Sequence, residues 1–309
     1  MRGEDYSIYV CPTCRAALAL DGDELRCAAG HAFPIRGGVP RFVTDEGYAA
    51  SFGYQWKQFS RAQLDSETGT DASRRRLLLG TGWPERLDGE TVLEAGCGMG
   101  RFTEVLLSTG ATVVSFDYSA AAEVTHEQFS SRGARVCQAS IYELPYRPAS
   151  FDRVFCYGVL QHCPDVERAF HSLVQAVKPG GHLAVDVYDR LRMFFNARYR
   201  VRWLTRRVPK ETLLRWCQRL VPAYMRVVPP LHPFNQLVVP IKDYRGRLGM
   251  AREHEIEWSV LDTMDALSPA YDQPQWLSTM KRWCRDAGLI DVWAKRGGNG
   301  IEVRARRPA

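Results

Sequence analysis

A short apolar segment that leads directly into a glycine-rich turn constrains this chain more than any other feature. Residues 91–93 predict a buried strand, and Gly96, Gly98 and Gly100 follow immediately. Apolar residues then recur at helical spacing from Phe102 onward, so the turn should open a helix. Alternating glycines let the backbone turn tightly and allow a ligand to lie against bare main chain. The segment therefore predicts an α/β domain with a ligand at the tip of this strand.

An acidic residue follows at the distance expected for ribose recognition. Asp117 ends the next apolar run, residues 111–116. It lies about 20 residues beyond the first glycine, where a carboxylate commonly binds a pair of ribose hydroxyls. The spacing of the glycines is not the one that cradles a pyrophosphate. A glycine-rich turn alone would be weak evidence, so the acid strengthens the prediction of a ligand site.

With Glu94 ahead of the turn, these residues resemble the first motifs of class I S-adenosylmethionine-dependent methyltransferases of the type-11 group. Later motifs of the family have similar counterparts here, in the same order, at residues 143–146, 150–154, 158–162 and 177–181. The resemblance covers roughly residues 90–190. It implies a Rossmann-like seven-stranded sheet whose final strand is antiparallel, and S-adenosyl-L-methionine as cofactor. The alternative is an ordinary α/β domain that binds no nucleotide.

The resemblance also suggests where the cofactor binds. We place strands near residues 91–95, 112–117, 135–138, 151–157, 182–188, 290–296 and 300–305. Ligands of such sheets lie beyond the carboxyl ends of the strands. Ser140 occupies a position where the family often has an Asp that contacts the adenine amine, so Ser140 or the backbone amide of Ile141 would take that role. The candidate cofactor-binding residues are Glu94, Gly96, Cys97, Gly98, Gly100, Asp117, Tyr118, Ser140, Ile141 and Tyr157.

Four residues near the N-terminus have the spacing of a zinc site. Cys11 and Cys14 form one close pair, and Cys27 and His31 form a second pair beyond a short predicted hairpin. Such a set suits tetrahedral zinc, and four protein ligands would make the site structural. Together with residues 33–40, the segment resembles Trm112-like zinc ribbons, which support methyltransferases. Ordinary buried or free thiols are the alternative.

These features divide the chain into five parts: a zinc ribbon (1–44), a linker or lid (45–85), the core (86–189), a basic and partly helical cap insertion (190–270), and a C-terminal helix with the last two strands (271–309). Residues 51–59 show no clear period but resemble a lid segment of type-11 methyltransferases, many of them from polysaccharide and natural-product gene clusters. Packing of this linker on the core is the other interpretation. We expect further helices at 72–79 and 274–287.

The insertion combines arginines with apolar residues at helical spacing between residues 190 and 226. It could be a solvated helix face, a cap that recognises an anionic substrate, or a surface that rests on anionic lipid. Residues 227–249 contain four prolines and should be mostly loop. Residues 262–272 resemble another type-11 segment, which we expect to return toward the active site.

His162 follows the fourth predicted strand and is the candidate general base or substrate-orienting residue. A histidine bonded to the turn at residues 163–165 is the structural alternative. We expect structural roles for His126, His171 and His182. The candidate substrate-binding residues are Tyr54, Trp56, Tyr188, Asp189, Tyr271 and Asp272.

The leading function is methylation, at oxygen or nitrogen, of a small-molecule, sugar or natural-product acceptor, including an anionic or lipid-linked glycoconjugate. An rRNA guanine methyltransferase is the main alternative, because the spacing of the zinc ligands also resembles that group and a basic insertion suits phosphates. A non-catalytic partner that binds the cofactor is the third. No signal peptide or apolar run near the roughly 20 residues needed to span a bilayer is evident. Nine scattered cysteines suggest a reducing compartment, so we expect a cytoplasmic location.

Overall fold

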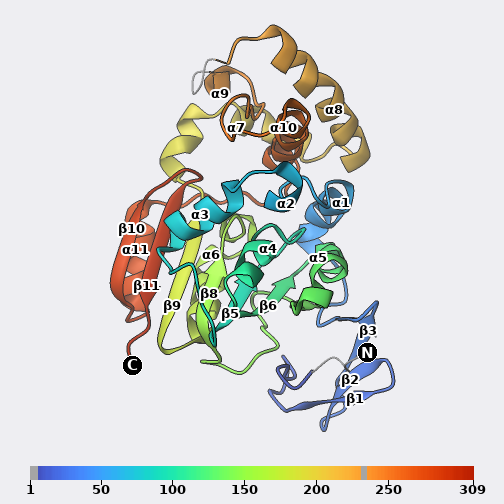
Figure 1. Cartoon of the computed structure of the whole chain (residues 1–309), viewed down its shortest axis with the longest axis vertical. Helices are drawn as coiled ribbons and strands as arrows, with labels where there is room; N and C mark the ends of the chain where they lie inside the picture. The colour runs from blue at the N-terminus through green and yellow to red at the C-terminus, as the bar shows by residue number, and fades with distance from the viewer. Residues whose placement is uncertain (1–5, 231–234) are drawn as a thin grey trace.

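A seven-stranded sheet forms the centre of the molecule in the computed structural model, which describes residues 6–230 and 235–309 (Figure 1). The strand order is β10-β11-β9-β8-β5-β6-β7. Strands β5 to β9 are parallel, and β11 runs antiparallel to both of its neighbours. The expected Rossmann-like sheet is therefore confirmed. Its strands are β5 (Thr91–Ala95), β6 (Thr112–Asp117), β7 (Arg135–Gln138), β8 (Phe151–Cys156), β9 (Val177–Val187), β10 (Ile290–Arg296) and β11 (Ile301–Arg306).

Alternate residues of the central strands enter two different cores. Leu93 faces a core shared with α6 (Val166–Ala176) and α11 (Leu277–Asp286), whereas Val92 faces a core shared with α3 (Ala72–Thr81) and α4 (Arg101–Ser108). This alternation follows from the period of two in a strand. Both faces of the central strands are covered, which is why β5 and β6 are largely apolar, whereas β10 and β11 near the edge keep exposed or polar residues. α5 (Ala121–Phe129) packs beside β7 near the edge of the sheet.

The N-terminal segment forms a small antiparallel sheet of β1 (Leu18–Asp21), β2 (Glu24–Cys27), β3 (Ala32–Arg36) and β4 (Val39–Pro40). It docks on the β7 edge of the large sheet, where Phe42 N donates to Gln138 O (2.8 Å) and Val10 N donates to Pro145 O (2.9 Å). Leu25 is fully buried and belongs to the same apolar core as β5 and β8. The ribbon therefore covers an open sheet edge and shares its core with the large domain.

The linker is more helical than its sequence pattern indicated. After η1 (Gly47–Ala49), residues 50–58 form α1 (Ala50–Gln58), and α2 (Asp65–Thr68) follows. Buried side chains of α1 include the polar Ser51 and Gln55, while Tyr54 and Trp56 pack against the cap. Because α1 is packed on more than one side, its apolar residues do not form a single stripe, which explains why the sequence shows no clear period.

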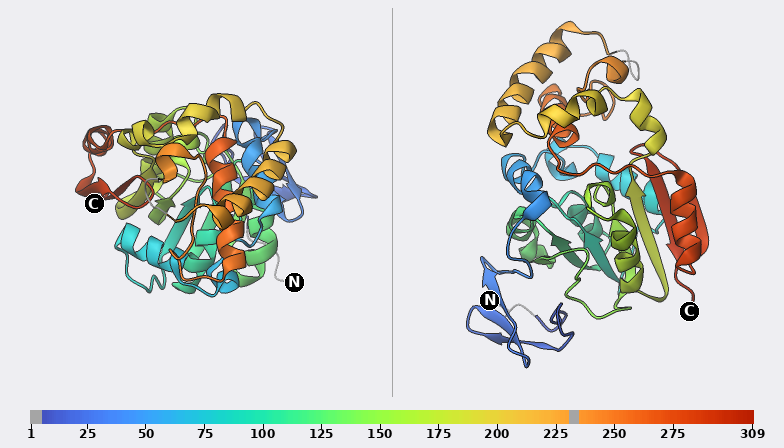
Figure 2. Two further views of the ribbon diagram at one scale, coloured as in Figure 1. Left: turned by 90° about the horizontal axis from the view of Figure 1, so that it is seen from above. Right: turned by 180° about the vertical axis from the view of Figure 1, so that it is seen from behind.

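The insertion forms a helical cap at the end of the molecule opposite the ribbon (Figures 1 and 2). Its elements are η4 (Arg190–Phe195), α7 (Arg198–Thr205), α8 (Lys210–Val227), α9 (Asn235–Val238) and α10 (Arg252–Leu267). Helix α10 lies outside our expectations. It packs on α8, α7 and α1. Its buried residues are therefore distributed around the helix, and no regular polar face marks it in the sequence. Among the described residues, no helix is long and apolar enough to cross a membrane.

The continuous core predicts that ribbon and sheet unfold together. Leu25→Ala should lower the free energy of unfolding by about 2–5 kcal/mol, because it removes buried methyl groups and leaves a cavity. Leu20→Ala is the matched control, since Leu20 is 58% exposed on the same small sheet and should change stability by less than about 0.5 kcal/mol. Urea unfolding followed by circular dichroism measures both. A separate early transition in Leu25→Ala, with the main transition unchanged, would show that the ribbon is not part of the common core.

Candidate cofactor and substrate site

A cavity lies at the carboxyl ends of the parallel strands, under the cap. The glycine turn and the end of β6 form one side, and α1 and α10 contribute side chains from above. Ten of the predicted site residues line it: Trp56, Gly96, Cys97, Gly98, Asp117, Tyr118, Ile141, Tyr157, His162 and Tyr188. Seven do not: Tyr54, Glu94, Gly100, Ser140, Asp189, Tyr271 and Asp272. The carboxyl edge of the sheet thus brings together most of the predicted cofactor residues.

The glycine turn lets neighbouring side chains lie very close to its backbone. Gly96 and Gly98 have φ angles of 74° and 56°, in the left-handed region that side chains rarely adopt. A Cβ on Gly96 would lie 2.3 Å from Val159 Cγ2, and one on Gly98 would lie 3.1 Å from the indole nitrogen of Trp56. Both positions therefore require glycine. Trp56 of α1 also lies directly over the turn, which links the linker segment to the predicted cofactor site.

Asp117 ends β6 and holds the turn in place. One carboxylate oxygen accepts a hydrogen bond from Gly98 N (3.0 Å), and the other accepts from Ser119 N (2.8 Å) and Ser119 Oγ (2.7 Å). Burial raises the pKa of the Asp117 carboxyl above its usual value. The residue also lines the cavity, and contact of its carboxylate with a ribose stays a prediction.

Glu94 lies behind the turn and does not line the cavity. Its carboxylate accepts hydrogen bonds from Thr103 Oγ1 of α4 (2.6 Å) and Ser115 Oγ of β6 (2.8 Å). Burial raises the pKa of Glu94 to about 7, against the opposing effect of these two hydrogen bonds. The observed contacts support the turn from below, and direct contact with a cofactor stays a prediction.

An aromatic wall, part of which the sequence did not reveal, closes one side of the cavity. Tyr48 stacks on Tyr118 with ring centroids 4.9 Å apart and planes 10° apart. Ile141 lines the same cavity, whereas Ser140 Oγ lies outside it and accepts a hydrogen bond from Tyr142 N (3.2 Å). Ile141 therefore lines the cavity and Ser140 does not, and contact of either residue with an adenine stays a prediction. Tyr48 precedes the predicted lid motif, and no signal in the sequence marked it.

His162 lines the cavity, and one of its ring nitrogens is hydrogen-bonded while the other has no partner among the described residues. Its Nδ1 lies 3.0 Å from the carbonyl oxygen of Tyr271, so its hydrogen-bond partner differs from the turn at residues 163–165 that we considered. A carbonyl can only accept, so Nδ1 carries the proton in the neutral ring and Nε2 keeps its lone pair. Nε2 is buried and has no partner among the described residues. Phe52 and Tyr188 flank the ring at 5.0 and 5.6 Å between centroids.

The cap adds two carboxylates that sequence reasoning did not single out. Asp262 and Asp265 of α10 both line the cavity. Asp262 accepts from Gln63 Nε2 (3.0 Å) and from the Tyr244 hydroxyl. Asp265 lies 3.5 Å from the hydroxyl of Tyr188. Both belong to the start of the segment that we expected to return toward the active site, and α10 does bring that part to the cavity.

Two arginines of the core reach the same cavity. Arg76 of α3 pairs with Asp186 at the end of β9 (2.7 Å), and Asp186 also accepts from Gly158 N (2.5 Å). Arg101, the first residue of α4, donates through Nε to Ser73 Oγ (3.0 Å). Burial lowers the pKa of Arg101 to about 10. Charged groups of both signs therefore face the enclosed space.

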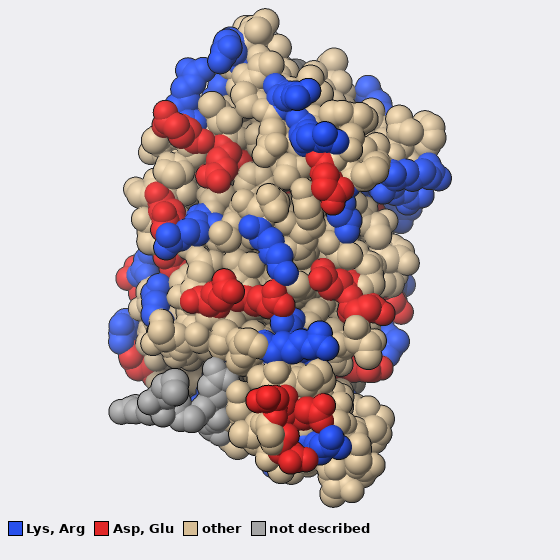
Figure 3. Space-filling view, turned by 90° about the vertical axis from the view of Figure 1, so that its right-hand side faces the viewer, with Lys and Arg blue, Asp and Glu red and all other residues tan. Residues whose placement is uncertain are grey.

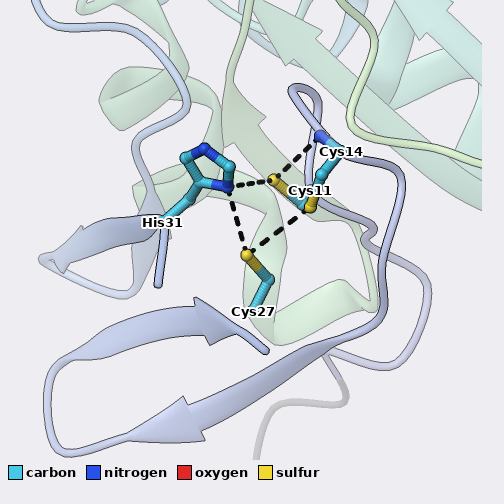
Figure 4. Close-up of side chains that lie close together, drawn as sticks. All are labelled: Cys11, Cys14, Cys27 and His31. Carbon is cyan, nitrogen blue, oxygen red and sulfur yellow. Dashed lines mark hydrogen bonds between the residues drawn. The ribbon is translucent and has the colours of Figure 1, made fainter. Parts of the chain in front are cut away.

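The four predicted zinc ligands converge in the ribbon (Figure 4). Their three sulfur atoms and His31 Nδ1 lie within 4.8 Å of one another. The Cys14–Cys27 sulfurs are 3.6 Å apart, and His31 Nδ1 lies 3.6 Å from Cys11 Sγ and 3.3 Å from Cys27 Sγ. Ligand atoms on a tetrahedron with Zn–S near 2.3 Å are separated by roughly 3.5–3.8 Å, so these residues fit zinc.

Comparison with known proteins agrees with this geometry. Residues 93–185, which run from within β5 into β9 and contain the glycine turn and His162, match a family model described as a methyltransferase domain. The core is a methyltransferase domain. The match covers less than a third of the chain, and the ribbon, linker and cap lie outside it.

The methyltransferase domain also has individual relatives. A ubiquinone biosynthesis O-methyltransferase from Alkalilimnicola ehrlichii is 32% identical over 131 residues, 41% of this chain and 53% of that protein. Methyltransferase GfsG from Streptomyces halstedii is 36% identical over 110 residues, 33% of this chain and 40% of that protein. The chain thus spans about half the length of these relatives or less. A solved S-adenosylmethionine-dependent methyltransferase from Mesorhizobium loti has a TM-score of 0.46 and 17% identity, covering 73% of this chain and 94% of that one.

Two of the predicted substrate contacts join the cap to the methyltransferase domain. Asp189 caps η4 and pairs with Arg296 of β10 (2.7 Å). Asp272 accepts from the Tyr199 hydroxyl (3.2 Å) and lies 3.7 Å from both Arg198 and Arg202 of α7. Tyr54 packs against the buried apolar residues of α8 and α10 in the cap, and Tyr271 contributes the carbonyl oxygen that orients His162. Contact of these four residues with a substrate stays a prediction.

Proposed function

We propose that this protein transfers a methyl group from S-adenosyl-L-methionine to a small-molecule acceptor, with His162 as the general base. The observation that carries the proposal is the buried, unpartnered Nε2 of His162, a residue that lines the same cavity as the glycine turn and Asp117. The match of residues 93–185 to a methyltransferase domain supports it. Bound S-adenosyl-L-methionine would supply an activated methyl group, so the protein's part is to orient the acceptor, exclude water and remove a proton.

The cofactor would lie across the glycine turn. Gly96 and Gly98 offer bare main chain, Asp117 would accept from the ribose hydroxyls, and Tyr118 with Ile141 would border the adenine. The acceptor would occupy the part of the cavity between His162 and α10. A hydroxyl acceptor must lose a proton, which suits a histidine with a free lone pair. The name of the Alkalilimnicola ehrlichii relative, an O-methyltransferase, also favours oxygen as the acceptor atom.

The cap makes a small acceptor more suitable than folded RNA. Helices α1 and α10 both supply residues that line the cavity, so the acceptor would be enclosed. Two arginines of the basic insertion, Arg198 and Arg202, are buried beside Asp272 and are not presented to solvent. A non-catalytic partner would have no need of the buried, oriented His162, so the catalytic interpretation is favoured over that alternative as well.

Asp117→Ala should weaken S-adenosyl-L-methionine binding. Loss of hydrogen bonds to a charged acceptor costs about 1.5–3 kcal/mol each, so affinity should fall at least tenfold in calorimetry. Because Asp117 also holds Gly98, the 2′-deoxyribose analogue of the cofactor is the control. It should bind wild type more weakly than the natural cofactor, whereas the variant should bind the two about equally. Equal discrimination by both proteins would contradict ribose recognition by Asp117.

His162→Gln should lower kcat by about 10²–10⁴-fold with little change in cofactor affinity, because the variant removes the base but keeps a polar side chain. Transfer of a radiolabelled methyl group to a panel of phenols and hydroxylated sugars would identify an acceptor and measure the rate. His171→Gln is the matched control, because His171 lies on α6 and does not line this cavity. If His162→Gln and the control retain the same kcat, His162 is not the base.

We also propose that Cys11, Cys14, Cys27 and His31 hold one structural zinc ion. Metal analysis of protein purified without chelator should give about one zinc per chain, since four protein ligands complete the shell. Cys27→Ser should lower both the zinc content and the unfolding temperature. Cys284→Ser is the control: it alters a buried cysteine of α11, outside the ribbon, and should leave the zinc content unchanged. The proposal would be contradicted if the wild-type protein contained no metal and its unfolding temperature did not change when zinc was added.

A further inference from the structure

Large apolar side chains that face solvent are concentrated in one part of this molecule. Nine of the fifteen exposed large apolar residues in the described chain fall between residues 191 and 238. Phe194 and Trp203, for example, are 69% and 61% exposed. Isolated exposed apolar residues are normal, but such a concentration usually marks an interaction surface. The nine are Leu191, Phe194, Phe195, Trp203, Leu204, Trp216, Leu220, Val227 and Val238.

Helix α8 shows that this exposure follows a pattern. One face carries side chains that are buried with apolar residues of α10 in the core of the cap: Leu213, Leu214, Cys217, Val221 and Met225. A second face carries Trp216, Leu220 and Val227, at intervals of four and seven residues, which places them in one stripe along the helix. Packing inside the cap accounts for the first face. It leaves the second apolar stripe without a partner within the described chain.

Arginines accompany these apolar residues. Eight exposed arginines lie between residues 190 and 226, and Glu211 is the only acidic residue from 190 to 230. Arg215 and Arg219 border the stripe of α8. Figure 3, which views the molecule from the right-hand side of Figure 1, shows basic side chains at the upper, cap end, with some acidic ones and uncharged surface between them. The eight are Arg190, Arg192, Arg200, Arg206, Arg207, Arg215, Arg219 and Arg226.

We propose that the outer cap surface, formed by the exposed side chains of η4, α7 and α8, binds the surface of an anionic lipid bilayer. Aromatic and aliphatic side chains would enter the boundary between headgroups and acyl chains, and the arginines would meet lipid phosphates. The proposal concerns attachment of the protein and is independent of the methyl-transfer reaction. It places the cap end, opposite the ribbon, against the membrane (Figures 1 and 2).

Two other occupants suit the surface less well. A second copy of the chain would bring one strongly basic face against another, and like charges opposed at an interface are unfavourable. RNA would satisfy the arginines and could stack on Trp203 or Trp216, but Leu204, Leu220 and Val227 gain nothing from phosphates or sugars. An anionic lipid surface suits both kinds of side chain, because its phosphates attract the arginines and its acyl chains accept the apolar residues.

Flotation of the full-length protein with lipid vesicles tests the proposal. Binding should be strong to phosphatidylcholine vesicles that contain phosphatidylglycerol and weak to phosphatidylcholine alone. Each arginine near an anionic surface contributes about a fivefold factor in affinity, so Arg215→Glu with Arg219→Glu should weaken binding by at least about 25-fold. Trp216→Ser with Leu220→Ser should weaken binding at high salt, where the charge contribution is screened.

Leu79→Ser is the matched control, because Leu79 is 72% exposed on α3, outside the cap, and should leave vesicle binding unchanged. Circular dichroism should show all variants folded, since every substituted side chain is exposed. Equal binding of wild type to both vesicle types, or equal losses in Leu79→Ser and the cap variants, would overturn the proposal. Tight, salt-sensitive binding to RNA fragments without affinity for anionic vesicles would overturn it in favour of RNA, and concentration-dependent dimerisation lost in the cap variants would do so in favour of a second copy.

Discussion

The hydrogen bond from Gly98 N to Asp117 is the interaction on which the site depends. It joins the turn after β5 to the end of β6, two neighbouring parallel strands, and so fixes the loop where the sheet presents its carboxyl ends. Glu94 supports the same loop from behind through Thr103 and Ser115. Since each of these contacts is buried, the loop is held in shape before any ligand arrives, which reduces the ordering cost of binding.

The cap is connected to this preorganised edge by polar contacts as well as by apolar packing. Asp189, which pairs with Arg296 of β10, caps η4 at the start of the cap, and Asp272 lies between Tyr199 and the two buried arginines of α7. The segment that carries Asp272 also contains Tyr271, whose carbonyl oxygen orients His162. The position of the candidate base is therefore coupled to the attachment of the cap. Movement of the cap would change both the enclosure of the acceptor and the orientation of the imidazole.

The ribbon is connected to the site through a short chain of hydrogen bonds. Arg41 donates to the side chains of Gln138 (2.6 Å) and Glu123 (2.5 Å), and Gln138 Nε2 donates to Tyr118 O (2.9 Å). Tyr118 is the residue after Asp117 and lines the cavity. A metal-stabilised ribbon at the β7 edge would therefore stabilise the sheet and also restrain the backbone beside the predicted ribose and adenine sites.

The sequence alone was enough to predict the order of the strands along the chain, the glycine turn, the places of Asp117 and His162 beside the cavity, and the convergence of the four candidate metal ligands of the ribbon. These depend on local patterns: apolar runs, glycines at positive φ and ligand spacing. Only the tertiary structure decided that α10 brings Asp262 and Asp265 to the cavity and that Tyr48 stacks on Tyr118. It also decided that Asp189 pairs with Arg296 of β10 and that Asp272 pairs with Arg198 of the cap. Such contacts join residues that are far apart in the chain. Which side chains meet depends on how the insertion packs, and no periodic pattern within a short segment of sequence predicts that packing.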